Sequence, residues 1–163
     1  MAAEQSTKSK DYWGPRLWRM FHLLAEISDR ADVSAQWRKW FVQTSNIMPC
    51  EKCRAHLRTY LRFNKFIRFQ NPLTNAKTVR DHIRAEIFKL HNHANANAEK
   101  PAFAEEDLAK AYGEKTRNEI LLETQTILGE VERHWLSLDF FKTRHQEWLS
   151  WKGTCIMIMA LLN

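Results

Sequence analysis

The sequence predicts an all-α fold. Its 163 residues contain only four glycines and four prolines, too few for the many turns that join short strands. Apolar residues recur near the helical period in several long segments. Hydrophobic residues make up 44% of the chain and aromatic residues 12%, which excludes an intrinsically disordered protein. A chain of this length is expected to form one core without structural metals or disulfides.

The first part of the chain is expected to hold a polar tail and three helices. The opening residues, MAAEQSTKSK, lack the apolar segment of a signal peptide, so residues 1–12 are predicted to be a flexible tail. The first helix is expected from about Trp13 to Ser28, with Pro15 in its first turn. Ser34 is the expected N-cap of the second helix. A proline at the first helical position predicts a third helix from about Pro49 to Phe63.

The rest of the chain is expected to hold four more helices. The pair Asn71-Pro72 marks a loop, and the fourth helix is predicted from about Thr78 until shortly before Pro101. The remaining helices are expected over Glu105 to Tyr112, from about Arg117 to Leu138, and around Trp148, Trp151 and Leu161. The sequence has no apolar run of about 18 residues, so no membrane-spanning helix is predicted.

Charge is distributed unevenly along a chain whose formal net charge is +6. From Glu51 to Lys89 there are ten basic and three acidic residues, whereas from Glu99 to Glu132 there are four basic and nine acidic residues. The basic block suits an anionic cofactor, a nucleic acid or simply a solvated helix face. The acidic, amphipathic helix that follows residue 115 is expected to pack on its own domain, on a second subunit or on a substrate, and its charge favours the basic core of the same or a partner subunit.

The most informative motif is Pro49-Cys50-Glu51-Lys52-Cys53-Arg54. Two cysteines three residues apart at a helix start can form a small disulfide ring, and the helix N-terminus with Lys52 and Arg54 stabilises a thiolate. Such a pair exchanges with an incoming dithiol through a mixed disulfide. Half of a zinc site and two inert thiols are the alternatives. The third cysteine, Cys155, lies in an apolar segment and is expected to be buried and structural.

A second group of residues could bind a nucleotide. Trp18 and His22 are four residues apart, as are His91 and Asn95, so each pair shares one helix face. Asn92 lies beside the second pair. Aromatic rings can stack on a flat ring system, and amide side chains can form hydrogen bonds with its edge. Taken singly, each of these residues is more often a core or surface residue than a ligand.

Several motifs follow one another from residue 13 to residue 112. They are Trp13-Gly14-Pro15, Trp18, His22, Pro49-Cys50, Cys53, His91-Asn92, Asn95, Lys100-Pro101, Phe103 and Tyr112. Their order and spacing resemble the Erv/ALR family of flavin-linked sulfhydryl oxidases. With its short Trp-Gly-Pro entrance and no cysteine-rich tail, the chain is most similar to the minimal members encoded by large cytoplasmic DNA viruses.

The resemblance implies a four-helix bundle with a short fifth helix that cradles FAD, over residues 13–114. A helical C-terminal extension follows over residues 115–163 and has no counterpart in the family core. Cys50 and Cys53 are then the catalytic pair beside the isoalloxazine ring, and no metal is expected. By position in the motifs, the residues expected to bind the flavin are Trp13, Gly14, Trp18 and His22, and those expected at the adenine and phosphates are His91, Asn92, Asn95, Lys100 and Tyr112.

The implied activity is the oxidation of dithiols in protein substrates to disulfides, with molecular oxygen reduced to hydrogen peroxide. The substrate is expected to attack Cys50, and the released Cys53 thiolate to reduce FAD. The resemblance also implies a homodimer. Neither a membrane nor a nucleic acid is expected as a partner. If the chain is viral, it is expected in the host cytoplasm or the virion, with the mitochondrial intermembrane space as the alternative. The alternative function is a non-enzymatic helical module that binds zinc or nucleic acid.

Overall fold

A computed structural model describes residues 2–66 and 76–163, with side chains described for residues 10–66 and 77–163. Regular structure in these ranges is helical throughout, which confirms the predicted all-α fold. The elements are α1 (Ala2–Glu26), α2 (Val33–Ile47), α3 (Glu51–Phe63), α4 (Ala76–Asn97), α5 (Glu105–Tyr112), α6 (Arg117–Leu136), the 3-10 helix η1 (Asp139–Phe141) and α7 (His145–Leu161). The loop predicted at Asn71-Pro72 lies outside the described residues.

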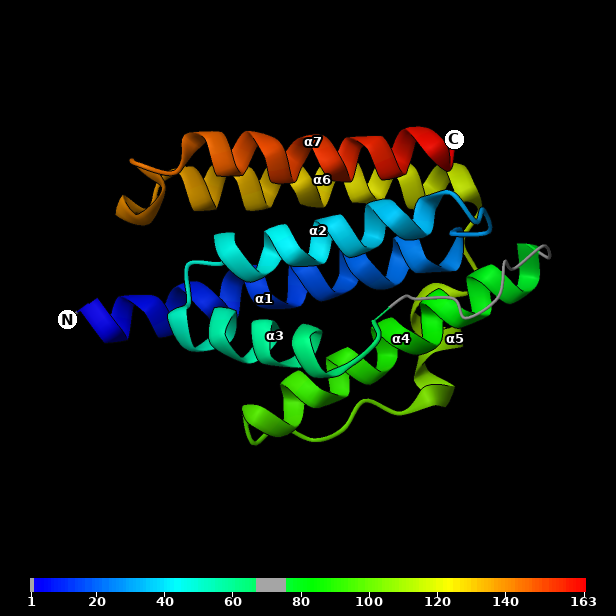
Figure 1. The fold of residues 1–163 in the computed structure, drawn as a ribbon, viewed down its shortest axis with the longest axis horizontal. Helices are drawn as coiled ribbons and strands as arrows, with labels where there is room; N and C mark the ends of the chain where they lie inside the picture. Colours follow the sequence, from blue (N-terminus) through cyan, green and yellow to red (C-terminus); the bar gives the residue numbers. More distant parts are fainter. Residues whose placement is uncertain (1, 67–75) are drawn as a thin grey trace.

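The helices stack in three layers (Figure 1). The middle layer is formed by α1 and α2, one of its faces is covered by α6 and α7, and the other carries α3, α4 and α5. On one face of the middle layer, α6 packs on α1 and α7 packs on α2. On the other face, α4 packs on α1 and α3 packs on α2. The predicted four-helix bundle, with its short fifth helix and helical C-terminal extension, is therefore confirmed.

The first helix begins earlier than predicted. Helix α1 starts at Ala2, so the backbone of residues 2–12 is helical and does not form a frayed tail. Six of residues 2–12 are alanine, lysine, glutamate or glutamine, which have high helix propensity, and no glycine or proline occurs before Gly14. Pro15 consequently lies inside the helix and not in its first turn. An apolar pattern does not predict this helix start, because residues 2–12 are mostly polar and show no apolar residues at helical spacing.

Two other helix starts differ slightly from the predicted positions. Ser34 lies inside the first turn of α2, where its Oγ donates to the carbonyl of Ala31 at 2.8 Å. Helix α3 begins at Glu51 and not at Pro49, because Cys50 has extended backbone angles (φ −111°, ψ 109°) and occupies the N-cap. The predicted caps were wrong by one turn or less, and the packed faces are unchanged.

The C-terminal extension shares the core of the molecule. Five tryptophans have no exposed surface: Trp37 and Trp40 on α2, Trp135 on α6, and Trp148 and Trp151 on α7. The indole Nε1–H of Trp151 donates to the buried Oγ1 of Thr44 at 2.8 Å, and its ring packs against Trp40 with centroids 5.4 Å apart. The pair of helices α6 and α7 therefore docks on its own chain.

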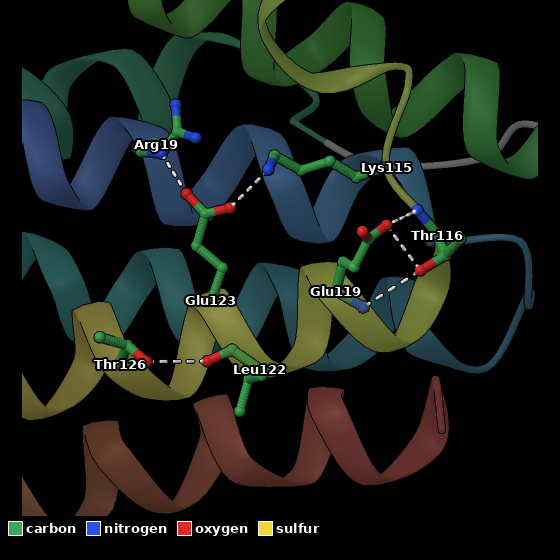
Figure 2. A network of polar contacts seen from close by, with 7 residues as sticks. All are labelled: Arg19, Lys115, Thr116, Glu119, Leu122, Glu123 and Thr126. Carbon is green, nitrogen blue, oxygen red and sulfur yellow. Dashed lines mark hydrogen bonds and ion pairs between the residues drawn. The ribbon is translucent and has the colours of Figure 1, made fainter.

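Ion pairs join the acidic extension to the basic side of α1. Glu123 of α6 accepts from Arg19 of α1 and from Lys115, whose Nζ lies 3.1 Å from Oε2 (Figure 2). A second pair joins Arg16 Nε to Glu130 Oε2 at 2.8 Å. Figure 2 also shows the capping box that begins α6. The predicted docking on the chain's own core is confirmed, but the basic residues that pair with α6 lie on α1 and at Lys115, outside the basic block of residues 51–89.

Candidate active site

A cavity of about 660 Å³ lies between the middle layer and the α3–α4 side of the molecule. Its lining comes from α1, α2, α3 and α4, with a contribution from Tyr112 of α5. The volume is within the range of small-molecule and cofactor sites, about 300–1,000 Å³. Nine of the predicted site residues line this cavity: Trp13, Gly14, Trp18, Cys50, Cys53, His91, Asn95, Lys100 and Tyr112.

The two motif cysteines form a disulfide at the start of α3. Cys50 and Cys53 are bonded, their Cα atoms lie 5.2 Å apart, and both line the cavity. Cys50 is the N-cap residue, and its Sγ accepts the backbone N–H of Cys53 at 3.1 Å. The free N–H groups and the dipole of the helix start favour negative charge at this position. The reduced pair therefore holds a stabilised thiolate.

His22 supports the cavity wall from behind. It lies outside the set of described residues that line the cavity, and it is 2% exposed. Its Nε2 lies 2.9 Å from Nδ1 of His91, and its ring stacks on Tyr112 with centroids 4.9 Å apart. Burial lowers the pKa of His22 to about 3 and the pKa of His91 to about 4, so both rings are neutral near pH 7. His22 thus orients two residues that do reach the cavity.

Asn92 binds the segment that follows α4. Its Nδ2 donates to the carbonyl of Phe103 at 3.1 Å, and its Oδ1 accepts the Phe103 N–H at 2.7 Å. These two bonds hold the α4–α5 connection, which includes Lys100, against α4. His22 and Asn92 thus both support neighbours at the cavity, and their predicted contact with a cofactor stays a prediction.

The cavity also includes side chains that the motifs did not single out. His56 and Leu57 follow Cys53 by three and four residues and share its helix face. Lys10 precedes Gly14 by four residues on α1. The helical period around each motif could have identified these positions. Phe41 and Thr44 of α2 also line the cavity, but no motif lies near them. Their place at the cavity depends on how α2 packs across α1.

The lining suits a large, flat and anionic cofactor. The rings of Trp18 and His91 are stacked, with centroids 4.3 Å apart and an interplanar angle of 8°. Lys52 and Lys100 place positive charge beside the cavity. The indole Nε1 of Trp13 is a buried donor with no hydrogen-bond acceptor in the described part of the structure. These features fit FAD, whose rings need stacking surfaces and whose pyrophosphate needs cations.

Metal-ligand clusters and membrane-spanning helices are both absent from the described ranges. No three His, Cys, Asp or Glu side chains come together within 2–66 and 76–163 in the way a metal site requires. None of the helices there is both long and apolar enough to cross a bilayer.

Comparison with known protein families identifies the sequence pattern. The model of the Erv1/Alr family matches residues 15–113, which is more than half of the chain. The chain belongs to the Erv1/Alr family. The match confirms the resemblance that the motifs carry. Seven of the nine predicted residues that line the cavity fall inside the matched range, and the C-terminal helices lie outside the Erv1/Alr pattern.

Three viral proteins, each named FAD-linked sulfhydryl oxidase, are similar to this Erv1/Alr chain. The protein of the Malawi tick isolate of African swine fever virus is 27% identical over 112 residues, which are 67% of this chain and 87% of the relative. The protein of the Kenya pig isolate is 29% identical over 92 residues, which are 55% and 70%. The protein of the Namibia warthog isolate is 30% identical over 87 residues, which are 52% and 66%. No solved structure matches the chain.

Proposed function

We propose that the chain is an FAD-dependent thiol oxidase that forms disulfides in dithiol proteins and reduces oxygen to hydrogen peroxide. The observation that carries the proposal is the Cys50–Cys53 disulfide, which lines a cavity suited to FAD. Membership of the Erv1/Alr family supports it, as do the three viral relatives named FAD-linked sulfhydryl oxidase.

The cysteine pair performs two thiol–disulfide exchanges. A substrate thiolate attacks Cys50 Sγ, which forms a mixed disulfide and releases the Cys53 thiolate beside the cavity. The second substrate thiolate then attacks the substrate sulfur of that mixed disulfide, so the substrate leaves as a disulfide and Cys50 leaves as a thiolate. The Cys53 N–H, which lies 3.1 Å from Cys50 Sγ, stabilises that leaving group. FAD, when bound, supplies the electron acceptor that returns the pair to the disulfide and delivers two electrons to oxygen.

The remaining lining residues would hold the cofactor. Trp18 would contact the flavin, with the backbone of Trp13 and Gly14 close by, as the family resemblance implies. His91 and Asn95, with the ring of Tyr112, would hold the adenine end. The ammonium group of Lys100 would neutralise the phosphates. His22 and Asn92 would act through their neighbours, by fixing the rings and the α4–α5 connection described above.

The proposed function also includes an oligomeric state and a location in the cell. We expect a homodimer that uses a surface other than the outer face of α1 and α2, since α6 and α7 cover that face. The viral relatives support a location in the host cytoplasm or the virion, with the mitochondrial intermembrane space as the alternative. In a reducing cytoplasm the enzyme would have to dock its substrates directly, because equilibration with bulk thiols would reduce them.

The purified chain should be yellow, release FAD on denaturation, and consume oxygen when given a small dithiol. The reason is that the cavity offers stacking rings and cations, and the disulfide lines its wall. Absorbance spectra and an oxygen electrode measure both properties, with peroxide formation as the product assay. A protein refolded with excess FAD that binds none of it and takes up no oxygen would contradict the proposed function.

A further inference from the structure

The segment that connects α6 to α7 reaches the redox end of α3. The ring of Phe140, within η1, lies under two guanidinium groups, that of Arg54 from α3 at 4.8 Å and that of Arg144 at 4.6 Å from the ring centroid. Figure 1 shows η1 and the start of α3 at the same end of the molecule. Each guanidinium makes a cation–π contact with the ring, which holds it in place. We refer to Arg54, Phe140 and Arg144 as the arginine cluster.

The arginine cluster lies at the same end of α3 as Cys50, the cysteine that the substrate is proposed to attack. Cys50 and Arg54 are four residues apart at the start of α3, and the backbone N–H of Arg54 donates to the carbonyl of Cys50 at 3.0 Å. The next residue in this series is Arg58, which is exposed one turn further along α3. Residues at this spacing share one face of a helix. Both side chains reach back towards the segment before α3, since Arg54 Nη1 donates to the carbonyl of Met48 and Arg58 Nη1 to that of Ser45 at 3.1 Å. A substrate whose thiol reaches Cys50 therefore approaches a basic end of α3.

The arginines of the cluster form no close ion pair with a carboxylate of the described residues. Within residues 10–66 and 77–163, neither Arg54 nor Arg58 nor Arg144 forms an ion pair. By contrast, the adjacent Lys142 is paired with Asp139 at 2.7 Å. Partial burial lowers the pKa of Arg54, repulsion from Arg144 and Arg58 lowers it further, and attraction to Glu51 acts in the opposite direction. The fold holds like charges together at a site where an acidic partner would relieve the repulsion.

We propose that the arginine cluster is a docking site for an acidic segment that flanks the reactive cysteine pair of the protein substrate. The inference rests on the proposed function, because it takes Cys50 as the point of attack. Arg54 Nη1 donates to the carbonyl of Met48, whereas the guanidinium of Arg144 makes no hydrogen bond within residues 10–66 and 77–163. The free N–H edge of a stacked guanidinium matches the geometry of a carboxylate. A peptide partner is favoured over nucleic acid because the charge lies on the same helix face as the sulfur that a substrate must reach. The extension outside the family pattern would thus contribute to substrate choice through Phe140 and Arg144.

Three dithiol peptides of equal length, with the cysteine pair flanked by glutamates, glutamines or lysines, test the proposal with the FAD-loaded full-length chain. Oxygen uptake gives kcat/KM for each peptide, and the rate with a small dithiol serves as the internal reference. We expect the glutamate peptide to exceed the glutamine peptide by about tenfold at low salt, because charge complementarity raises the association rate. The ratio should fall towards one in high salt, where exposed charges are screened.

Variants in the segment that connects α6 to α7 test whether Arg144 causes the preference for the glutamate peptide. R144Q should bring the ratio of glutamate to glutamine peptide close to one, and R144E should favour the lysine peptide. K142Q is the matched control, because Lys142 lies in the same segment but is already paired, and its ratio should equal that of the wild type. R144K keeps the charge and should retain most of the preference, even if Arg144 also supports the local fold.

Equal kcat/KM for the glutamate and glutamine peptides in the wild type would overturn the docking proposal, as would an unchanged ratio in R144E. Binding of a labelled DNA duplex that R144Q abolishes, without any charge preference among peptides, would assign the cluster to nucleic acid and overturn it as well. A wild-type chain that oxidises no small dithiol would instead contradict the proposed function itself, so the two failures are distinguishable.

Discussion

Replacing Cys53 by serine is expected to lower dithiol oxidation by a factor on the order of 10³ or more, the scale seen when an enzyme loses an essential nucleophile. The reason is that Cys53 lines the cavity and is the partner that the first exchange releases. Replacing Cys50 should abolish turnover to a similar degree, because the substrate then has no disulfide to attack. Oxygen uptake with a small dithiol, at equal FAD content, measures both losses.

The two serine variants should differ in their spectra. In C50S, Cys53 remains as a lone thiol in the first turn of α3, and its thiolate beside bound FAD should give a long-wavelength absorbance band. C53S should lack this band, and its appearance there would mean that the roles of the two cysteines are reversed. The matched control is Cys155→Ala. Cys155 has no exposed surface, and burial raises the pKa of its thiol, so this change should preserve turnover.

Removal of the C-terminal extension is expected to have the largest effect on stability. A chain that ends after Lys115 would expose Trp13 and Trp40, whose buried rings pack against Trp135 of α6 and Trp151 of α7. It should therefore aggregate, associate or unfold before any change in its chemistry can be assessed. The single change Trp151→Ala should lower the free energy of unfolding by about 3–5 kcal/mol, the usual cost of an aromatic-to-alanine change in a core.

Chemical denaturation followed by circular dichroism and gel filtration test this second prediction. Leu149→Ala is the matched control on the same helix, because Leu149 is 46% exposed and its loss should change stability by no more than about 0.5 kcal/mol. A truncated chain that stays monomeric with wild-type stability would contradict the conclusion that the extension completes the core.

Helix positions could be predicted where the chain carries local signals. Helix α5 has the predicted bounds, Glu105–Tyr112, since three acidic residues fill its first turn and Gly113 follows its last residue. The start of α1 could not be predicted from an apolar pattern, because residues 2–12 are polar helix formers. The packing of α7 could not be predicted either. Trp148 and Trp151 are buried but Leu149 and Ile156 are exposed, so apolar residues occur on both of its faces and do not indicate which one docks.

The sequence predicted which residues belong to the candidate site better than it predicted where their side chains lie. Spacing placed Cys50 and Cys53 together, and the structure bonds them. The motif positions of His22 and Asn92 were predicted to contact a cofactor, but motif spacing does not give the direction of a side chain. In the structure His22 and Asn92 form hydrogen bonds with His91 and Phe103, and their predicted contacts with the cofactor stay predictions. The contact of Phe140 with Arg54 could not be predicted, because it joins segments far apart in sequence.

Anaerobic mixing of the FAD-loaded protein with a small dithiol tests the central claim most directly. If electrons pass through Cys50 and Cys53, the wild-type flavin absorbance should bleach, and full reduction should consume one dithiol for the cysteine pair and one for the cofactor. C53S should keep its flavin oxidised under the same conditions. Bleaching of C53S at the wild-type rate would contradict the account, because dithiols would then reduce the flavin without the disulfide.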